Sequence, residues 1–426
     1  MKKVLIICTT PRDKRELSFN RVRGDYDIVF HDFDADLIDR VVSKGTKKLP
    51  AHLEPEYIIK ELATLAQEHK VDGLLATDDY PGSLFASFMA QELGLYAPSL
   101  ESILICQHKY YARCAQRELV PDATPHFTLI DAKQDLTRQI AHFSFPFFLK
   151  PVKSYFSLYA NKVTDMHDLE MHTQQPIKFF LYHFDWFLKQ YPAYDVPAHY
   201  LIAEGLLQGV QVTLEGYVYN GQVAIQGIVD SIMFPGTICF ARFDYPSFLP
   251  QEVQERMGTI AKTFMQGIGF DNGIFNIEFM YNSATDAIDI IEVNPRMASQ
   301  FADLFEKVDG TNSYQTLLAL ATGTQPLGRT RQGNYACATS YVLRIFDDHH
   351  IAHIPQAEDI EKAYKEFPDA RIELFGRPGY KLSDELQDGK SFRYGLIHLG
   401  AQDWQELFEK VEACKAMLPY IMQQVH

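Results

Sequence analysis

The clearest pattern of apolar and polar positions in the chain lies in residues 273–297, GIFNIEFMYNSATDAIDIIEVNPRM. Its first half alternates apolar and polar side chains with a period of two, which is typical of a half-buried β-strand. A turn-rich segment follows at 282–286, and a second apolar run occupies 288–293. The pattern predicts a β-hairpin.

This hairpin would bring polar side chains from both strands onto one face. If the turn centres near Thr285, Glu278 lies opposite Glu292 and Asn276 lies opposite Asn294, because directly opposed residues of antiparallel strands share a face. Opposed carboxylates repel each other unless a cation lies between them, and Mg²⁺ binds one or two carboxylates together with nucleotide phosphates. The spacing alone favours a metal site and an ordinary solvated hairpin face equally.

The first part of the chain alternates short apolar runs with helix-like segments. The runs VLIIC, IVFHDFD and VDGLLAT are separated or followed by helical patterns at 58–69 and 82–93, and this order predicts an open parallel sheet. Such sheets bind ligands beyond the carboxyl ends of their strands, here near Thr9 and near Thr77–Asp79. Asp78 and Asp79 are explained equally well as acidic residues that stabilise a helix N-terminus through the helix dipole. No GxGxxG follows the first strand, so dinucleotide binding is not predicted.

Composition narrows the classes of partner. The chain has 426 residues with 40 basic and 55 acidic side chains, a net charge of -15, which argues against nonspecific nucleic-acid or anionic-membrane binding. No apolar stretch is long enough for a transmembrane helix, and the run after Met-Lys-Lys is too short for a signal peptide, so we expect a cytoplasmic protein. The six cysteines show no metal-like spacing and are interpreted as reduced thiols.

The end of the hairpin carries a family resemblance. Pro295 ends the strand pairing, and the planar guanidinium of Arg296 suits phosphate or carboxylate. The run IIEVNPR, with an acidic strand residue 14 positions before its glutamate in FNIEF, resembles the metal-binding pair of the ATP-grasp superfamily. Members of this superfamily join carboxylates to nucleophiles through acyl phosphates. The resemblance implies that Glu278, Glu292 and Asn294 bind Mg²⁺ or Mn²⁺, and that Arg296 is catalytic by holding the acyl phosphate.

The resemblance covers nearly the whole chain and is to the carboxylate–amine ligase type, with the organisation of biotin carboxylases and amino-acid ligases. It implies an α/β and α+β fold in three parts: an N-terminal parallel-sheet domain, a two-lobed ATP-grasp domain and a small C-terminal α+β domain. The expected bounds are 1–105, 106–330 and 331–426, with a small lobe at about 125–205 and a large metal-binding lobe at about 206–330.

Two lysines match positions that hold ATP phosphates in the family. Residues 92–125 resemble the segment that leaves the N-terminal domain, where Lys109 opens a helix. Residues 145–163 resemble the two strands and the loop that cover the phosphates, with Lys150 as the second phosphate lysine. Lys150 stands among apolar and aromatic neighbours, and burying an ammonium without an anion is costly.

The loop after Lys150 departs from the family pattern. Relatives have a glycine- and serine-rich loop whose backbone approaches the phosphates, whereas residues 153–159 read KSYFSLY, without glycine. Ser154 and Ser157 remain as hydroxyl donors to the nucleotide. This departure favours an altered phosphate pocket.

Residues 199–221 resemble the hinge strand beside adenine and the strand that follows it. The resemblance implies that Glu204, Gly205 and Leu206 present backbone groups to the adenine edge, and that Gln211 occupies the position at which many relatives bind ribose through an acidic residue. Arg242 is a further candidate, for the substrate carboxylate, although an ion pair with a neighbouring aspartate explains it as well.

Together these features indicate an ADP-forming ligase that activates a small carboxylate with Mg-ATP and transfers it to an amine, acting alone or as a homodimer. Three alternatives remain at this point. A bicarbonate-using carboxylase of the biotin type shares the architecture. A nucleotide-binding protein without ligase activity is favoured by the glycine-free loop and by Gln211. A subunit whose ATP chemistry serves a partner protein also fits.

Overall fold

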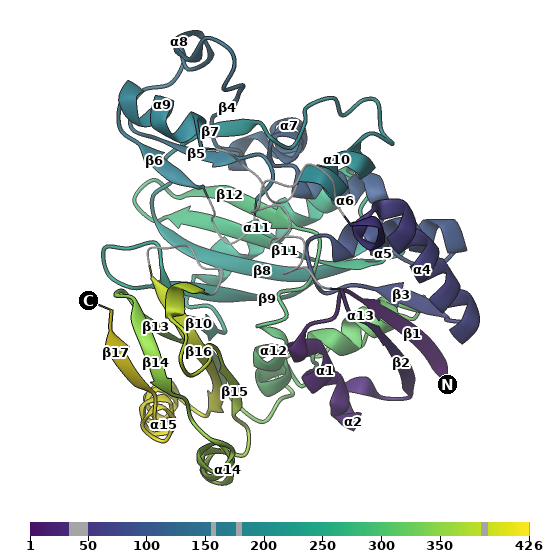
Figure 1. The fold of residues 1–426 in the computed structure, drawn as a ribbon, viewed down its shortest axis with the longest axis vertical. Helices are drawn as coiled ribbons and strands as arrows, with labels where there is room; N and C mark the ends of the chain where they lie inside the picture. The colour runs from purple at the N-terminus through teal and green to yellow at the C-terminus, as the bar shows by residue number, and fades with distance from the viewer. Residues whose placement is uncertain (34–49, 155–158, 176–180, 385–390, 426) are drawn as a thin grey trace.

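The computed structural model describes residues 1–33, 50–154, 159–175, 181–384 and 391–425 (Figure 1). It combines a parallel sheet near the N-terminus with antiparallel sheets in the rest of the described chain. The predicted α/β and α+β class is therefore confirmed. No helix in the described ranges is long and apolar enough to cross a membrane.

The N-terminal sheet has the strand order β2-β1-β3, and all its pairings are parallel. Val4 and Ile6 pack in one cluster with α13, while Leu5 and Ile7 pack with α4 and α5 on the other face, so β1 is buried on both sides. The continuous apolar run VLII predicts this burial. The elements are β1 (Lys2–Ile7), α1 (Pro11–Ser18), α2 (Asn20–Arg23), β2 (Tyr26–His31), α4 (Pro55–His69), β3 (Gly73–Leu75), α5 (Gly82–Leu93), α6 (Leu100–Gln107) and α7 (Lys109–Leu119).

A four-stranded antiparallel sheet, β4-β7-β5-β6, follows. Beside it, α10 packs its aromatic residues against α5, with the Phe187 and Phe85 rings 5.1 Å apart, as the apolar composition of this segment predicts. Figure 1 shows this sheet as a separate layer above the large sheet. The elements are β4 (Phe127–Ile130), α8 (Leu136–Gln139), β5 (Phe147–Pro151), β6 (Asn161–Val163), α9 (Met166–Thr173), α10 (Leu181–Leu188) and β7 (Leu201–Gly205).

The large sheet is antiparallel, with the strand order β12-β11-β8-β9-β10-β13-β16-β15. Its last three strands come from the predicted C-terminal domain, so that domain shares one sheet with the predicted large lobe. The elements up to residue 330 are β8 (Val210–Tyr219), β9 (Gln222–Met233), β10 (Phe240–Tyr245), α11 (Gln251–Gly267), β11 (Gly273–Asn282), β12 (Ala287–Asn294), α12 (Ala302–Asp309) and α13 (Ser313–Ala321).

Beyond residue 330, a two-stranded sheet of β14 and β17 lies beside the end of the large sheet (Figure 1). The remaining elements are β13 (Cys337–Ile345), β14 (His349–His353), α14 (Ala357–Glu366), β15 (Arg371–Leu374), β16 (Phe392–Ala401), α15 (Trp404–Ala416) and β17 (Ile421–Gln424), with short 3₁₀ helices at Ala51–Leu53, Pro121–Ala123 and Leu382–Asp384.

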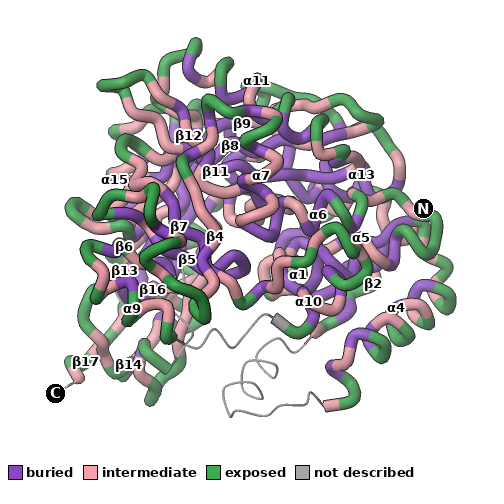
Figure 2. The backbone as a smooth tube through the Cα atoms, turned by 90° about the horizontal axis from the view of Figure 1, so that it is seen from above, coloured by how far each residue is buried: buried purple, intermediate pink, exposed green. Residues whose placement is uncertain are grey.

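Helices cover both faces of the large sheet. On one face α11 packs against β8 and β9, and α15 packs against β13 and β16; on the other face α12 packs against β10, β13 and β16. Figure 2 shows buried residues along β8, β9 and β11 and exposed residues along the outer side of α4. The face of β8, β11 and β12 that points away from α11 carries the polar residues of the predicted hairpin.

The chain between residues 298 and 323 forms two helices, α12 and α13, with a break between them. Gly310 ends α12 with a φ of 81°, a left-handed conformation that glycine adopts without strain. Asn312 then caps α13 through its side chain. The break allows α12 to pack on the large sheet while α13 packs on the N-terminal sheet, so the two sheets meet at these helices.

Candidate functional site

The hairpin of β11 and β12 has the predicted register. Glu278 pairs with Glu292 and Asn276 pairs with Asn294, with a bulge after Glu278. Asn276 and Asn294 are buried, and the Asn294 side-chain amide donates to Oδ1 of Asn276 at 3.3 Å. The alternation of apolar and polar residues was sufficient to predict this pairing because a one-residue slip would expose the whole apolar face.

The two glutamates of the hairpin have different electrostatic surroundings. Burial, followed by the charge of Glu292, raises the pKa of Glu278 to about 7. Burial also opposes ionisation of Glu292, but Lys109 and Lys150 outweigh it and hold the pKa of Glu292 below its ordinary value. Nζ of Lys109 lies 2.8 Å from Oε1 of Glu292. Gln211, the predicted ribose ligand, instead donates from Nε2 to Oε2 of Glu278 at 2.9 Å.

Facing the hairpin, α7 and β5 supply buried cations. Lys109 is the first residue of α7, as predicted, and Lys150 is the fourth residue of β5. Lys150 Nζ lies 2.8 Å from Oε2 of Glu204, and Nε of Arg113 lies 2.8 Å from its Oε1. Burial would raise the pKa of Glu204, but these two cations lower it to about 2. Sequence reasoning missed Arg113, although it stands one helical turn after Lys109 and therefore on the same face.

The hinge strand β7 lies between β4 and β5, where Glu204 pairs with Phe127 on one side and Phe148 on the other. The Gly205 amide donates to the carbonyl of His126 at 2.9 Å. Leu206 directly follows β7 and is partly buried. The structure thus places the Glu204 side chain in an ion cluster, while its role and those of Gly205 and Leu206 toward adenine stay predictions.

The loop after β5 is tied to both neighbouring regions. The carbonyl of Ser154 accepts a hydrogen bond from Nζ of Lys109 at 3.3 Å, which places Ser154 beside one of the two predicted phosphate lysines. Lys153 is buried, and its Nζ contacts Oδ2 of Asp79 at 3.1 Å and Oε1 of Gln107 at 3.0 Å. Ser157, the second predicted hydroxyl donor, lies outside the described residues.

Asp78 and Asp79, which follow β3 of the N-terminal sheet, lie near Arg296 at the end of the hairpin. Burial, followed by the charge of Asp79, raises the pKa of Asp78 to about 7. Arg296 lowers the pKa of both aspartates, which places its guanidinium within electrostatic reach of them. The prediction that ligands bind near Thr77–Asp79 therefore concerns residues that adjoin the hairpin.

Arg296 lies in a loop, residues 295–301, that links β12 to α12. Within the described chain, its guanidinium donates to Met297 O at 3.2 Å and to Asn294 Oδ1 at 3.4 Å, two long hydrogen bonds. The loop backbone is held more firmly, because the Ala298 amide donates to the fully buried Glu215 at 2.6 Å. The loop is therefore fixed while the Arg296 head group keeps most of its hydrogen-bonding capacity.

Arg242 does not join this site. Pairing across β8, β9 and β10 puts Phe243 on the face that carries Glu278, so its neighbour Arg242 points to the opposite face. There its Nε lies 2.7 Å from Oδ2 of Asp244, and its guanidinium lies 4.8 Å from the ring centre of Phe408 in α15. The alternative reading of Arg242, an ion pair with a neighbouring aspartate, describes this geometry.

The residues fit a hard divalent cation bound together with a ligand. Among the described residues, no group of three or more His, Cys, Asp and Glu side chains is arranged to hold a metal by itself. The predicted set offers two carboxylates and an amide, Glu278, Glu292 and Asn294, which are oxygen donors of the type that Mg²⁺ prefers. Nδ2 of Asn276 is buried without a hydrogen-bond partner, so the polar face of the hairpin is incompletely satisfied. Phosphate oxygens would complete such a site.

Comparisons with known proteins identify a domain match in the middle of the chain. Residues 143–303 match the family described as the ATP-grasp domain. None of the curated proteins compared with the chain shows significant sequence similarity to it.

Solved structures resemble the chain over its full length. L-amino acid ligase from Bacillus licheniformis superposes with a TM-score of 0.71 at 18% identity, covering 100% of this chain and 99% of that one. Biotin carboxylase from Campylobacter jejuni gives 0.64 at 13% identity, covering 99% and 92%. N5-carboxyaminoimidazole ribonucleotide synthetase from Thermotoga maritima gives 0.63 at 15% identity, covering 99% of both chains. At these identities the similarity establishes the fold, and the family match to the ATP-grasp domain concerns residues 143–303.

Proposed function

We propose that the protein is an ADP-forming ligase that activates a small-molecule carboxylate as an acyl phosphate with Mg-ATP and transfers the acyl group to an amine. The observation that carries this proposal is the opposition of Glu278 and Glu292 on the hairpin to Lys109 and Lys150, with Arg296 at the end of the same hairpin. Such a set can hold a polyphosphate, a divalent cation and an anionic intermediate at once.

Each group has a distinct role in this proposal. Lys109 and Lys150 exchange Glu292 and Glu204 for phosphate oxygens when ATP binds, while Glu204, Gly205 and Leu206 line the adenine edge. Ser154, which lies beside Lys109, offers its hydroxyl to the phosphates. Gln211 orients Glu278 through its observed hydrogen bond, a role that replaces the predicted ribose contact.

On the large lobe, Glu278, Glu292 and Asn294 would hold Mg²⁺ or Mn²⁺. A bound cation supplies charge neutralisation for the phosphate oxygens during phosphoryl transfer. Arg296 then stabilises the negative charge of the acyl phosphate and orients it toward the amine, which is electrostatic and positional assistance. Its two long hydrogen bonds leave it free to take such a ligand.

The proposal keeps the expected organisation, with domains at 1–105, 106–330 and 331–426, and a cytoplasmic enzyme that acts on small molecules. Sequence resemblance allows a monomer or a homodimer. Light scattering after size-exclusion chromatography distinguishes the two.

The test is Mg²⁺-dependent release of ADP and phosphate from ATP, with pools of amino acids, other small carboxylates and bicarbonate as candidate substrates. Stimulation by a carboxylate pool together with an amine pool supports the ligase. Stimulation by bicarbonate alone would favour the carboxylase instead. ATP binding without turnover in any pool would overturn the proposal.

A further inference from the structure

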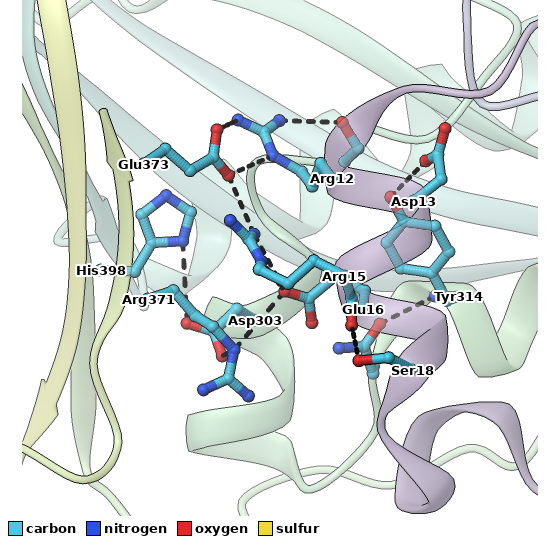
Figure 3. Close-up of polar contacts among 12 residues, drawn as sticks. Arg12, Asp13, Arg15, Glu16, Ser18, Asp303, Tyr314, Arg371, Glu373 and His398 are labelled. Atoms are coloured by element: carbon cyan, nitrogen blue, oxygen red, sulfur yellow. Dashed lines mark hydrogen bonds and ion pairs between the residues drawn. The ribbon is translucent and has the colours of Figure 1, made fainter. Parts of the chain in front are cut away.

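A second cluster of buried charges lies where the N-terminal helix, α12 and the C-terminal strands meet (Figure 3). We call it the junction cluster; its members are Arg12, Arg15 and Glu16 of α1, Asp303 and Lys307 of α12, Arg371 and Glu373 of β15, and His398 of β16. Neither the family resemblance nor the proposed function assigns these residues a role.

Arg12 connects this cluster to the candidate site. Its Nε and Nη2 donate to the two carboxylate oxygens of Glu373, both at 2.7 Å, in the bidentate geometry that an arginine fork favours. Its remaining nitrogen, Nη1, donates to Oγ of Ser299 at 2.9 Å. Ser299 stands three residues after Arg296 in the 295–301 loop. One guanidinium therefore joins β15 to the loop that carries Arg296.

The position of Arg12 is itself well fixed. Asp13, the next residue, is fully buried and accepts hydrogen bonds from the hydroxyls of Tyr314 at 2.5 Å and Thr77 at 2.8 Å. Thr10 and Asp13 form a capping box at the start of α1. Figure 3 shows Asp13 turned toward Tyr314 while Arg12 points toward Glu373. The first turn of α1 is thus anchored without help from Arg12.

Two further hydrogen bonds to the loop come from the large sheet. Glu215 of β8 accepts from the Ala298 amide at 2.6 Å, and Ser340 of β13 accepts from Nε2 of Gln300 at 2.8 Å. Between these two points, Arg12 donates to the side chain of Ser299. Of these three hydrogen bonds at consecutive residues, the one from Arg12 comes from outside the large sheet.

Because a displacement of about 1 Å at a reacting group costs on the order of 100-fold in rate, a support this close to Arg296 affects catalysis. We infer that Arg12 is a positioning residue for Arg296, and that it transmits the placement of the C-terminal strand β15 to the catalytic loop. This inference rests on the proposed function for its effect on turnover. Its structural part, the control of loop order by Arg12, does not.

The test compares Arg12→Ala with Arg15→Ala. Arg15 also binds Glu373, at 2.9 Å, and Glu16, but its recorded contacts do not include the 295–301 loop, so it is the matched control. Hydrogen exchange of peptides covering the loop is measured first, because it needs no turnover. We expect faster exchange across the loop in Arg12→Ala and wild-type exchange there in Arg15→Ala.

Steady-state kinetics give the second readout. Arg12→Ala should lower kcat roughly 10- to 100-fold with little change in KM for ATP, and Arg12→Lys should recover only part of the loss, because an ammonium cannot bridge both partners as a planar fork does. Ser299→Ala, which removes one contact and keeps the ion pair, should lower kcat less, and adding it to Arg12→Ala should have almost no further effect.

Unchanged loop exchange in Arg12→Ala, or equal acceleration in Arg15→Ala, would overturn the inference. If Arg12→Ala does not fold, Arg12→Lys and Ser299→Ala decide the question by the same two readouts. If the wild-type protein shows no turnover, the proposed function fails, while the exchange measurement still decides whether Arg12 controls the loop.

Discussion

The candidate site, called the cleft below and formed by Lys109, Lys150, Glu278, Glu292 and Arg296, and the junction cluster both bury several charges, but the two regions pair these charges differently. In the junction cluster, Arg12 and Arg15 contact Glu373, and Lys307 contacts Asp303 at 2.5 Å. Burial would raise the pKa of Glu373, but its hydrogen bond and ion pair with Arg12 lower it to about 2, and Asp303 is likewise lowered, chiefly by Lys307. Neighbouring cations of the protein therefore stabilise the ionised form of both carboxylates without any ligand.

In the cleft, the carboxylates are not fully paired with cations. Glu278 faces a second carboxylate, its pKa is raised to about 7, and Arg296 makes two long hydrogen bonds. A polyphosphate with a divalent cation would supply the missing opposite charges. The difference concerns charge pairing: buried carboxylates paired with cations indicate a structural role, whereas two buried carboxylates that face each other indicate a ligand site. Substitutions in the cleft should therefore affect activity, and those in the junction cluster, apart from Arg12 with its contact to the 295–301 loop, should affect stability.

The largest expected effect is on turnover. Glu292→Gln should lower ATP-dependent turnover by more than about 100-fold while the protein stays folded, because it removes a charge that the proposed metal site requires. ADP release and circular dichroism measure the two quantities. A soluble variant with normal activity would show that the metal assignment is wrong.

On the other side of the comparison, Asp303→Asn should destabilise the protein by about 3–5 kcal/mol, because Lys307 and Arg371 lose a buried counterion. Turnover per folded molecule should stay close to that of wild type. Urea unfolding measures the free energy, and Glu412→Gln, from an exposed pair with Lys415, is the control that should change it by less than about 1 kcal/mol. Equal losses of unfolding free energy in Asp303→Asn and Glu412→Gln would contradict a special structural role for the buried ion pairs of Asp303.

Acid should weaken the junction cluster through Glu373. Its folded pKa of about 2 is below the ordinary 4.5, so its contribution is present above pH 4.5 and is lost as the pH falls toward 2. The shift corresponds to on the order of 3 kcal/mol. The stability difference between wild type and Glu373→Gln, followed by urea unfolding, should shrink across this range; a pH-independent difference contradicts the ion pair.

The smallest expected change in stability is a gain and not a loss. Glu278→Gln should stabilise the protein without nucleotide or metal by about 0.5–2 kcal/mol, because it removes a buried charge that opposes Glu292, while it abolishes turnover. Thermal unfolding in the presence of a chelator measures this change. A destabilised variant would mean that Glu278 is satisfied in the protein alone, as Asp303 is.

Local patterns in the sequence predicted much of the cleft. The pairing of Glu278 with Glu292 followed from a period of two and a short turn, whereas the position of Lys109 at a helix start followed from the family resemblance of residues 92–125. The first prediction depends on residues that are close in the chain, where register has a direct signal.

Long-range placement could not be predicted in this way. The face occupied by Arg242 depends on two successive strand pairings, and the contact of Arg12 with Glu373 joins residues 361 positions apart. The continuation of the large sheet into β13, β16 and β15 likewise has no local signal. Each of these features depends on which strands become neighbours, which periodicity does not specify.

The proposed function requires that this site activates a carboxylate as an acyl phosphate. The most direct measurement is trapping with hydroxylamine, which intercepts acyl phosphates as hydroxamates, in reactions that contain the protein, Mg-ATP and pools of carboxylates. We predict a hydroxamate whose formation requires ATP, one carboxylate pool and Glu292. ADP release without a hydroxamate from any carboxylate pool would contradict carboxylate activation.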